Sequence, residues 1–146
     1  MSDDGVGPRV IERLCERYHF CPEVATLDGG TLGLDLLPRL EGIDNLLIID
    51  AIDIGAAPGT VQRLSGDEVP AAFCTKLSPH QMGLQDLLAV ANLQGYAPPN
   101  LVLWGVQPES IEMEMSLTPV VAPLVDVLIA KVVAELEQWG FTARPR

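Results

Sequence analysis

Histidine is scarce in this sequence, which makes His80 the first residue to consider for chemistry. It is one of 2 histidines in 146 residues and lies in TKLSPHQMGLQDLL, residues 75–88. An imidazole can ligate a metal ion or carry a proton. Ser78 and Gln81 match a capping box, which would explain the polar residues around His80 without any chemistry. Taken alone, the segment fits a loop histidine in front of a helix.

Two aspartates lie where a carboxylate could act. Asp50 ends the apolar run NLLIID, and Asp28 opens the glycine turn DGGTLG. Asp50 could serve as a ligand or general base, or it could accept backbone N–H bonds as a turn former; burying it without a partner would be costly. Asp28, Gly29 and Gly30 could contact a substrate or only permit a tight turn. The residues alone leave both choices open.

Serine and cysteine nucleophiles are not indicated, because none lies in a recognisable elbow or triad motif. The 3 cysteines, Cys15, Cys21 and Cys74, form no C-x-x-C spacing, so neither a disulfide framework nor a zinc cage is predicted. Cys15 is expected on the core-facing side of a helix. We expect reduced thiols in a cytoplasmic protein.

Helices with apolar faces must position these residues. Residues 8–18 have apolar side chains at helical spacing, with Pro8 at the first helical position. A short helix is predicted before Pro38. Residues 83–95 form a further helix that ends at Gly95. The last helix is predicted from Pro119, with Thr118 as its N-cap, to a stop at Gly140.

Strand signals alternate with these helices. EVATL, residues 23–27, and NLVLWGV, residues 100–106, are predicted strands, and residues 60–64 form a short strand near an edge. NLLIIDAI, residues 45–52, is almost continuously apolar, which is typical of a strand buried on both faces, and we place it at the sheet centre.

The alternation predicts one α/β domain spanning residues 1–146: a three-layer sandwich with a mostly parallel twisted sheet flanked by helices. Ligands of such sheets bind beyond the carboxyl ends of the strands. That rule selects Asp28, Asp50 and the segment that holds His80.

Composition narrows the range of partners. The 20 acidic against 9 basic residues give a formal charge of −11, which repels nucleic acid and anionic membranes and attracts a cation or a basic protein segment. No basic apolar leader is present, and no apolar run approaches the roughly 18 residues needed to span a bilayer. We expect neither nucleic-acid binding nor membrane insertion.

Seven segments, in order, resemble the maturation endopeptidases of nickel-iron hydrogenases. They are DDGVGPRVIERL, LDGGTLGLDLL, LLIIDAID, APGTV, LSPHQMGLQDLL, GVQPES and SLTPVV. The resemblance runs from about Asp3 to the C-terminus, essentially the whole chain. The family resemblance implies an endopeptidase that removes a C-terminal extension from the hydrogenase large-subunit precursor after nickel insertion. The nickel would be supplied by the substrate; zinc or cadmium could substitute in a structure. The enzyme is expected to be a monomer.

The family's metal-contacting positions fall on Asp4, Asp50 and His80. One imidazole and two carboxylates form a mixed N and O ligand set that suits borderline ions. Two mechanisms stay open: the metal polarises the scissile carbonyl or activates a water, or it docks the substrate while Asp4 or Asp50 acts as general base. Asp4 would also favour a helix dipole by about 0.3–1 kcal/mol with no function at all.

The chain departs from the family pattern at its start. Family members begin with a strand and a G-x-G-N turn, and SDDGVGPRV follows neither here. We therefore expect an N-terminally truncated form that lacks the first strand of the fold. The alternative function is a catalytically impaired or inactive relative acting as a non-enzymatic α/β binding module. No G-x-G-x-x-G or G-x-x-x-x-G-K-[ST] motif indicates a phosphate cradle for such a module.

Overall fold

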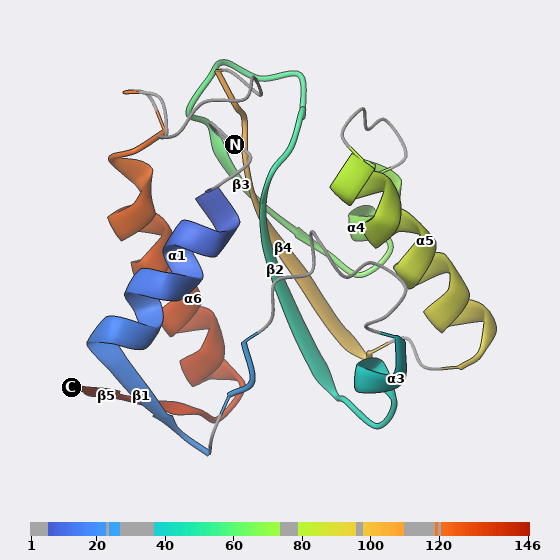
Figure 1. The fold of residues 1–146 in the computed structure, drawn as a ribbon, viewed down its shortest axis with the longest axis horizontal. Helices are drawn as coiled ribbons and strands as arrows, with labels where there is room; N and C mark the ends of the chain where they lie inside the picture. The colour runs from blue at the N-terminus through green and yellow to red at the C-terminus, as the bar shows by residue number, and fades with distance from the viewer. Residues whose placement is uncertain are drawn as a thin grey trace.

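Helices and strands alternate along the chain in the computed structural model (Figure 1), which describes residues 6–22, 24–26, 37–73, 79–95, 98–109, 119 and 121–146. The helices are α1 (Val6–Arg17), α3 (Leu37–Leu40), α4 (Glu68–Phe73), α5 (Pro79–Leu93) and α6 (Leu124–Gln138). The strands are β1 (Tyr18–Cys21), β2 (Asn45–Ala51), β3 (Val61–Ser65), β4 (Asn100–Val106) and β5 (Thr142–Pro145). None of the described helices is long and apolar enough to cross a membrane.

The main sheet has the strand order β2-β4-β3. β2 runs parallel to β4, with Asn45 opposite Asn100 and Asp50 opposite Gly105, whereas β3 runs antiparallel to β4. The sheet of the described residues is therefore mixed, and β4 rather than β2 lies between two neighbours. An apolar run indicates that both faces of a strand are buried. It does not indicate how many strands pair with the edges of that strand, so it could not identify the central strand.

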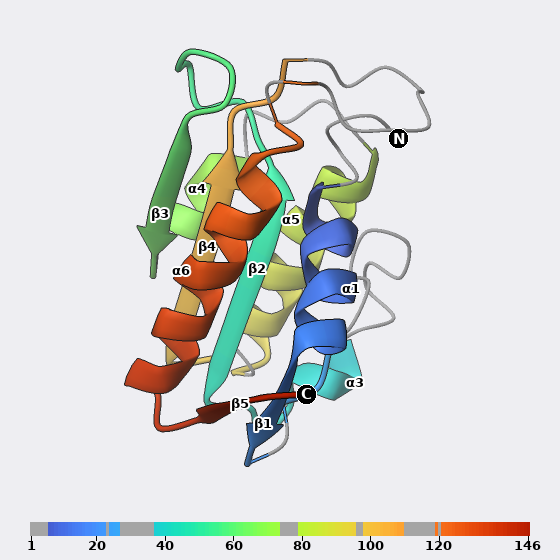
Figure 2. The same ribbon diagram turned by 90° about the vertical axis from the view of Figure 1, so that its left-hand side faces the viewer.

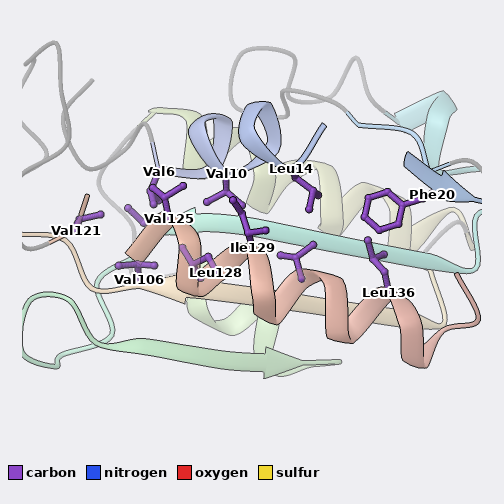
Figure 3. Packing of buried hydrophobic residues seen from close by; sticks show 12 residues of the cluster. Val6, Val10, Leu14, Phe20, Val106, Val121, Val125, Leu128, Ile129 and Leu136 are labelled. Atoms are coloured by element: carbon purple, nitrogen blue, oxygen red, sulfur yellow. The ribbon is translucent and has the colours of Figure 1, made fainter. Parts of the chain in front are cut away.

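Helices cover both faces of this sheet, which confirms the α/β sandwich. α1 and α6 pack on one face, and α3, α4 and α5 on the other (Figures 1 and 2). The first face is closed by a buried cluster, cluster A, that includes side chains of α1 and α6 (Figure 3). Its members are Val6, Val10, Leu14, Phe20, Ala51, Val106, Val121, Val125, Leu128, Ile129, Val132 and Leu136.

The second face has its own buried cluster, cluster B. Its members are Leu40, Ile52, Leu64, Val69, Leu87, Leu88, Ala91 and Leu103, contributed by α3, α4, α5, the strands and Ile52 beyond β2. All members of cluster B are aliphatic, in line with an aromatic content of only 5% in the sequence. The two clusters are separated by the backbone of the sheet.

A second, two-stranded sheet corrects the prediction of a strand at EVATL. β1 pairs antiparallel with β5, with Tyr18 opposite Pro145 and Cys21 opposite Thr142. Residues 24–26 form no strand in the structure. Tyr18 has helical spacing from Leu14, but it belongs to β1 because its backbone pairs with the distant C-terminal strand. Local periodicity in the sequence cannot reveal such a partner.

Prolines shift two of the predicted helix starts. α5 begins at Pro79 and therefore contains His80, which was expected in the preceding loop. Proline suits the first helical turn because its missing N–H is not needed there. α6 begins only after Pro123, since a proline inside a helix from Pro119 would remove a hydrogen bond and clash with the preceding turn. The short helix predicted before Pro38 lies outside the described residues, and Pro38 itself lies in the first turn of α3.

Glycine ends α5 and α6 as predicted. Gly95 has φ +77° and Gly140 has φ +97°, the left-handed conformation that terminates many helices.

A half-buried ion pair links the edge strand β3 to α6. Arg63 Nε lies 2.6 Å from Glu135 Oε1, and Arg63 Nη2 lies 3.2 Å from Glu135 Oε2. The Glu135 side chain is 5% exposed and that of Arg63 44%. The hydrogen bond to Glu135 raises the pKa of the Arg63 guanidinium, so the stability linked to the Arg63 charge is lost as the pH rises through this raised pKa.

Replacing Arg63 by Met is expected to destabilise the fold by about 2–3 kcal/mol, because Glu135 would keep its charge without a partner. The loss is smaller than for a fully enclosed pair, since water reaches the Arg63 side. The free energy of unfolding in urea measures it. Arg13→Met is the control: Arg13 lies 3.7 Å from exposed Asp126, and its loss should cost less than about 1 kcal/mol. Equal effects of the two changes would contradict the prediction.

Candidate functional site

Asp50 lies at the carboxyl edge of the sheet, one residue before the end of β2. Its side chain is only 4% exposed. Side chains alternate between the faces of a strand, and Leu46 and Ile48 of the same strand pack against cluster B. The alternation therefore directs Asp50 toward the helical layer that contains α5.

The first turn of α1 sits directly against the backbone beside Asp50. Val6 is fully buried, and a β-carbon added to Gly7 would overlap the carbonyl oxygen of Ile49. Only glycine allows a helix to approach a strand this closely. This contact places the start of α1 against β2, one residue before Asp50.

The first turn of α5 lies at the same end of the molecule. His80 is the second residue of this helix. In both ribbon views the beginning of α1, the end of β2 and the beginning of α5 lie at the same end (Figures 1 and 2). Helical crossovers between parallel strands bring the carboxyl ends of the strands and the starts of the helices to the same edge of the sheet. This edge is where ligands of open α/β sheets bind.

The described residues include only part of the predicted site. Asp50 is described with its side chain, whereas His80 is described only by its position on α5. Asp4, Asp28, Gly29 and Gly30 lie outside the described residues. Among the side chains that the structure describes, no group of three His, Cys, Asp or Glu is arranged to hold a metal ion. The ligand set of Asp4, Asp50 and His80 stays a prediction.

A loop of residues 52–60 continues the chain beyond Asp50 and was not singled out from the sequence. Ile54 N and Ala56 N donate hydrogen bonds of 2.7 and 3.3 Å to Gln107 Oε1. Gln107 follows β4 directly and is 9% exposed. A polar side chain immediately after a buried strand, in GVQPES, was the available signal; sequence alone could not show which backbone groups it meets.

Cys15 is not on the core-facing side of its helix, which corrects the expectation. Cys15 and Cys21 are exposed free thiols, and Cys15 Sγ lies 3.8 Å from Thr26 Oγ1. Cys15 follows Leu14 at the margin of the apolar face of α1. A small rotation of the helix there decides whether a side chain is buried or exposed.

The Cys15 thiol borders a hollow of about 210 Å³ near β1. It is lined by Cys15, Tyr18, His19, Phe20, Val24, Thr26 and Arg146. β1 and β5 lie at the end of the molecule opposite the carboxyl edge (Figures 1 and 2). The hollow is therefore separate from the site around Asp50.

Comparison with known proteins gives consistent results. A family model described as "Hydrogenase maturation protease" matches residues 8–135. The hydrogenase 2 maturation protease of Escherichia coli K12 is 42% identical over 147 residues, covering 100% of this chain and 90% of the relative. The hydrogenase expression/formation protein HupD of Rhodobacter capsulatus is 45% identical over 141 residues, covering 95% of this chain and 67% of the relative.

A solved structure extends this similarity to the fold. The hydrogenase maturating endopeptidase HybD from E. coli superposes with a TM-score of 0.94 at 42% sequence identity, covering 100% of this chain and 91% of that chain.

Proposed function

Since this chain belongs to the hydrogenase maturation proteases and is thus a peptide-bond hydrolase, we propose that it matures the large subunit of a nickel-iron hydrogenase. It removes a C-terminal extension from the precursor after nickel has been inserted. The nickel is part of the substrate, and its presence licenses cleavage. The observation that carries this proposal is the position of Asp50 at the carboxyl edge, beside the first turns of α1 and α5.

Asp4, Asp50 and His80 are proposed to contact the substrate's nickel. Asp4 precedes the first described residue of α1 by two positions, and consecutive Cα atoms are about 3.8 Å apart. Because Gly7 lies against Ile49, a chain of this length would allow Asp4 to reach the region of Asp50. His80 occupies the first turn of the helix that Asp50 faces. Asp28, Gly29 and Gly30 are proposed to contact the substrate peptide.

The acidity of the chain favours both parts of this substrate. A formal charge of −11 attracts a divalent cation and a basic peptide segment. Asp50, at the edge of the sheet, can either help hold the metal that polarises the scissile carbonyl or act as general base for the attacking water. Each role requires the ionised carboxylate, and each accounts for the placement of an acid at the end of an apolar strand.

Nickel-dependent cleavage is the direct test. The protein is mixed with purified large-subunit precursor, either nickel-loaded or nickel-free, and the products are weighed by mass spectrometry. We expect loss of a C-terminal fragment from the nickel-loaded precursor and a rate at least about 100-fold lower for the nickel-free form. Equal rates would remove nickel recognition from the proposal. No cleavage of either form would instead support a non-enzymatic binding module.

A further inference from the structure

The loop of residues 52–60 is fastened to the sheet by one residue. In addition to the two hydrogen bonds that its side chain accepts from Ile54 N and Ala56 N, Gln107 donates its backbone N–H to Thr60 O at 2.8 Å. Its carbonyl oxygen accepts a 2.8 Å bond from Gly59 N. Four hydrogen bonds from a single buried glutamine thus hold both the beginning and the end of the loop.

Further backbone N–H groups of the loop form hydrogen bonds within the loop itself. Gly55 N donates to Asp53 Oδ1 at 3.0 Å, and Thr60 N donates to Ala57 O at 3.1 Å. Water could serve these groups equally well, because residues 55–58 are exposed. A connection that only joined β2 to β3 would not need a buried amide to fix its shape. The arrangement instead ties an exposed turn to a buried side chain.

This loop begins two residues after Asp50. Asp50 lies opposite Gly105 in the ladder, and Gln107 follows two residues later. Ile52 N donates to Val106 O at 2.9 Å, which continues the pairing of the two strands past Asp50. A β-carbon on Gly105 would lie 2.7 Å from Ile52 Cγ2, so the loop leaves the sheet packed closely over β4.

We propose that Gln107 is a positioning residue for peptide hydrolysis. Its side chain holds the loop of residues 52–60 as a fixed wall next to Asp50, and the substrate peptide is aligned against that wall. The inference rests on the proposed function, because it assumes that Asp50 marks the site of cleavage. Gln107 itself does not touch the reacting atoms; it acts through the loop. Misplacing a substrate-aligning segment by about 1 Å can cost on the order of 100-fold in rate.

Two substitutions separate this role from general stability. Gln107→Met has a side chain of similar length without the acceptor oxygen, whereas Gln107→Glu retains oxygens that can accept both N–H groups. Cleavage of nickel-loaded precursor is measured at a temperature at which circular dichroism shows every variant folded. Amide hydrogen exchange at Ile54 and Ala56, followed by NMR, reports the loop directly.

We expect Gln107→Met to lower kcat/KM by about 10- to 100-fold and to accelerate exchange at both amides. Gln107→Glu should restore protection and should cleave within a few-fold of the wild type. The proposal is overturned if Gln107→Met cleaves like the wild type, or if Gln107→Glu restores protection without activity. Failure of the proposed function is a different outcome, in which the wild-type protein does not cleave the precursor at all.

Discussion

Asp50→Asn is expected to lower the rate of cleavage of nickel-loaded precursor by at least about 100-fold, within the range that general bases and metal-linked carboxylates contribute. Asparagine matches the shape of the buried side chain and keeps one acceptor oxygen, so the packing at the end of β2 is preserved. What it removes is the negative charge, which both mechanisms require. Single-turnover cleavage, together with the thermal unfolding midpoint, measures the two effects separately.

Asp44→Asn is the matched control, because Asp44 is exposed and lies immediately before β2, at the end opposite Asp50. It should leave cleavage within about two-fold of the wild type, since charges so far from the reacting bond are screened by water and salt. If Asp50→Asn cleaves as fast as Asp44→Asn, Asp50 takes no part in the chemistry. A large fall in the unfolding midpoint of Asp50→Asn would assign the residue a structural role instead.

Gly7→Ala is expected to weaken both the fold and the reaction. The added methyl group would overlap the backbone carbonyl of Ile49, which cannot rotate away as a side chain can. α1 must then move off β2, at a cost of about 1–3 kcal/mol for overpacking. The same shift would move the start of α1, which the proposed ligand Asp4 precedes, relative to Asp50. We therefore expect a lower free energy of unfolding in urea and, at a temperature at which the variant is folded, slower cleavage.

Glu12→Ala controls for the change in helix composition, because Glu12 is exposed on the same helix. Alanine there should alter stability by no more than about 0.5 kcal/mol and should leave cleavage unchanged. Full activity of Gly7→Ala despite its lower stability would show that the seating of α1 does not position a reacting group. Unchanged stability would show that the close approach to Ile49 is not needed.

Local pattern in the sequence predicted much of the scaffold. The apolar run up to Asp50 identified β2 and placed a carboxylate at its end, and the rule for ligand sites in open α/β sheets then selected that edge. The pairing of β1 with β5 was not predictable in this way, because Tyr18 and Pro145 are brought together by the packing of α1 and α6 and not by any nearby signal.

Local sequence patterns predicted less of the site than of the scaffold. Asp4 precedes a helix and has a sufficient structural explanation there, so only the family resemblance assigned it to a metal. Gln107 was missed for a different reason: its role depends on the position of backbone N–H groups about fifty residues earlier in the chain. Hydrogen bonds between distant segments leave no periodicity in the sequence.

The separation of the buried side chains into clusters A and B has a consequence for substrate binding. α1 is held by cluster A and α5 by cluster B, on opposite faces of the sheet. With the proposed ligands, nickel would join the two helical layers as a cross-link at their common end. Binding of the nickel-loaded precursor would then stabilise the enzyme by mass action, and relative movement of the layers would be smallest at the moment when the peptide bond is cut.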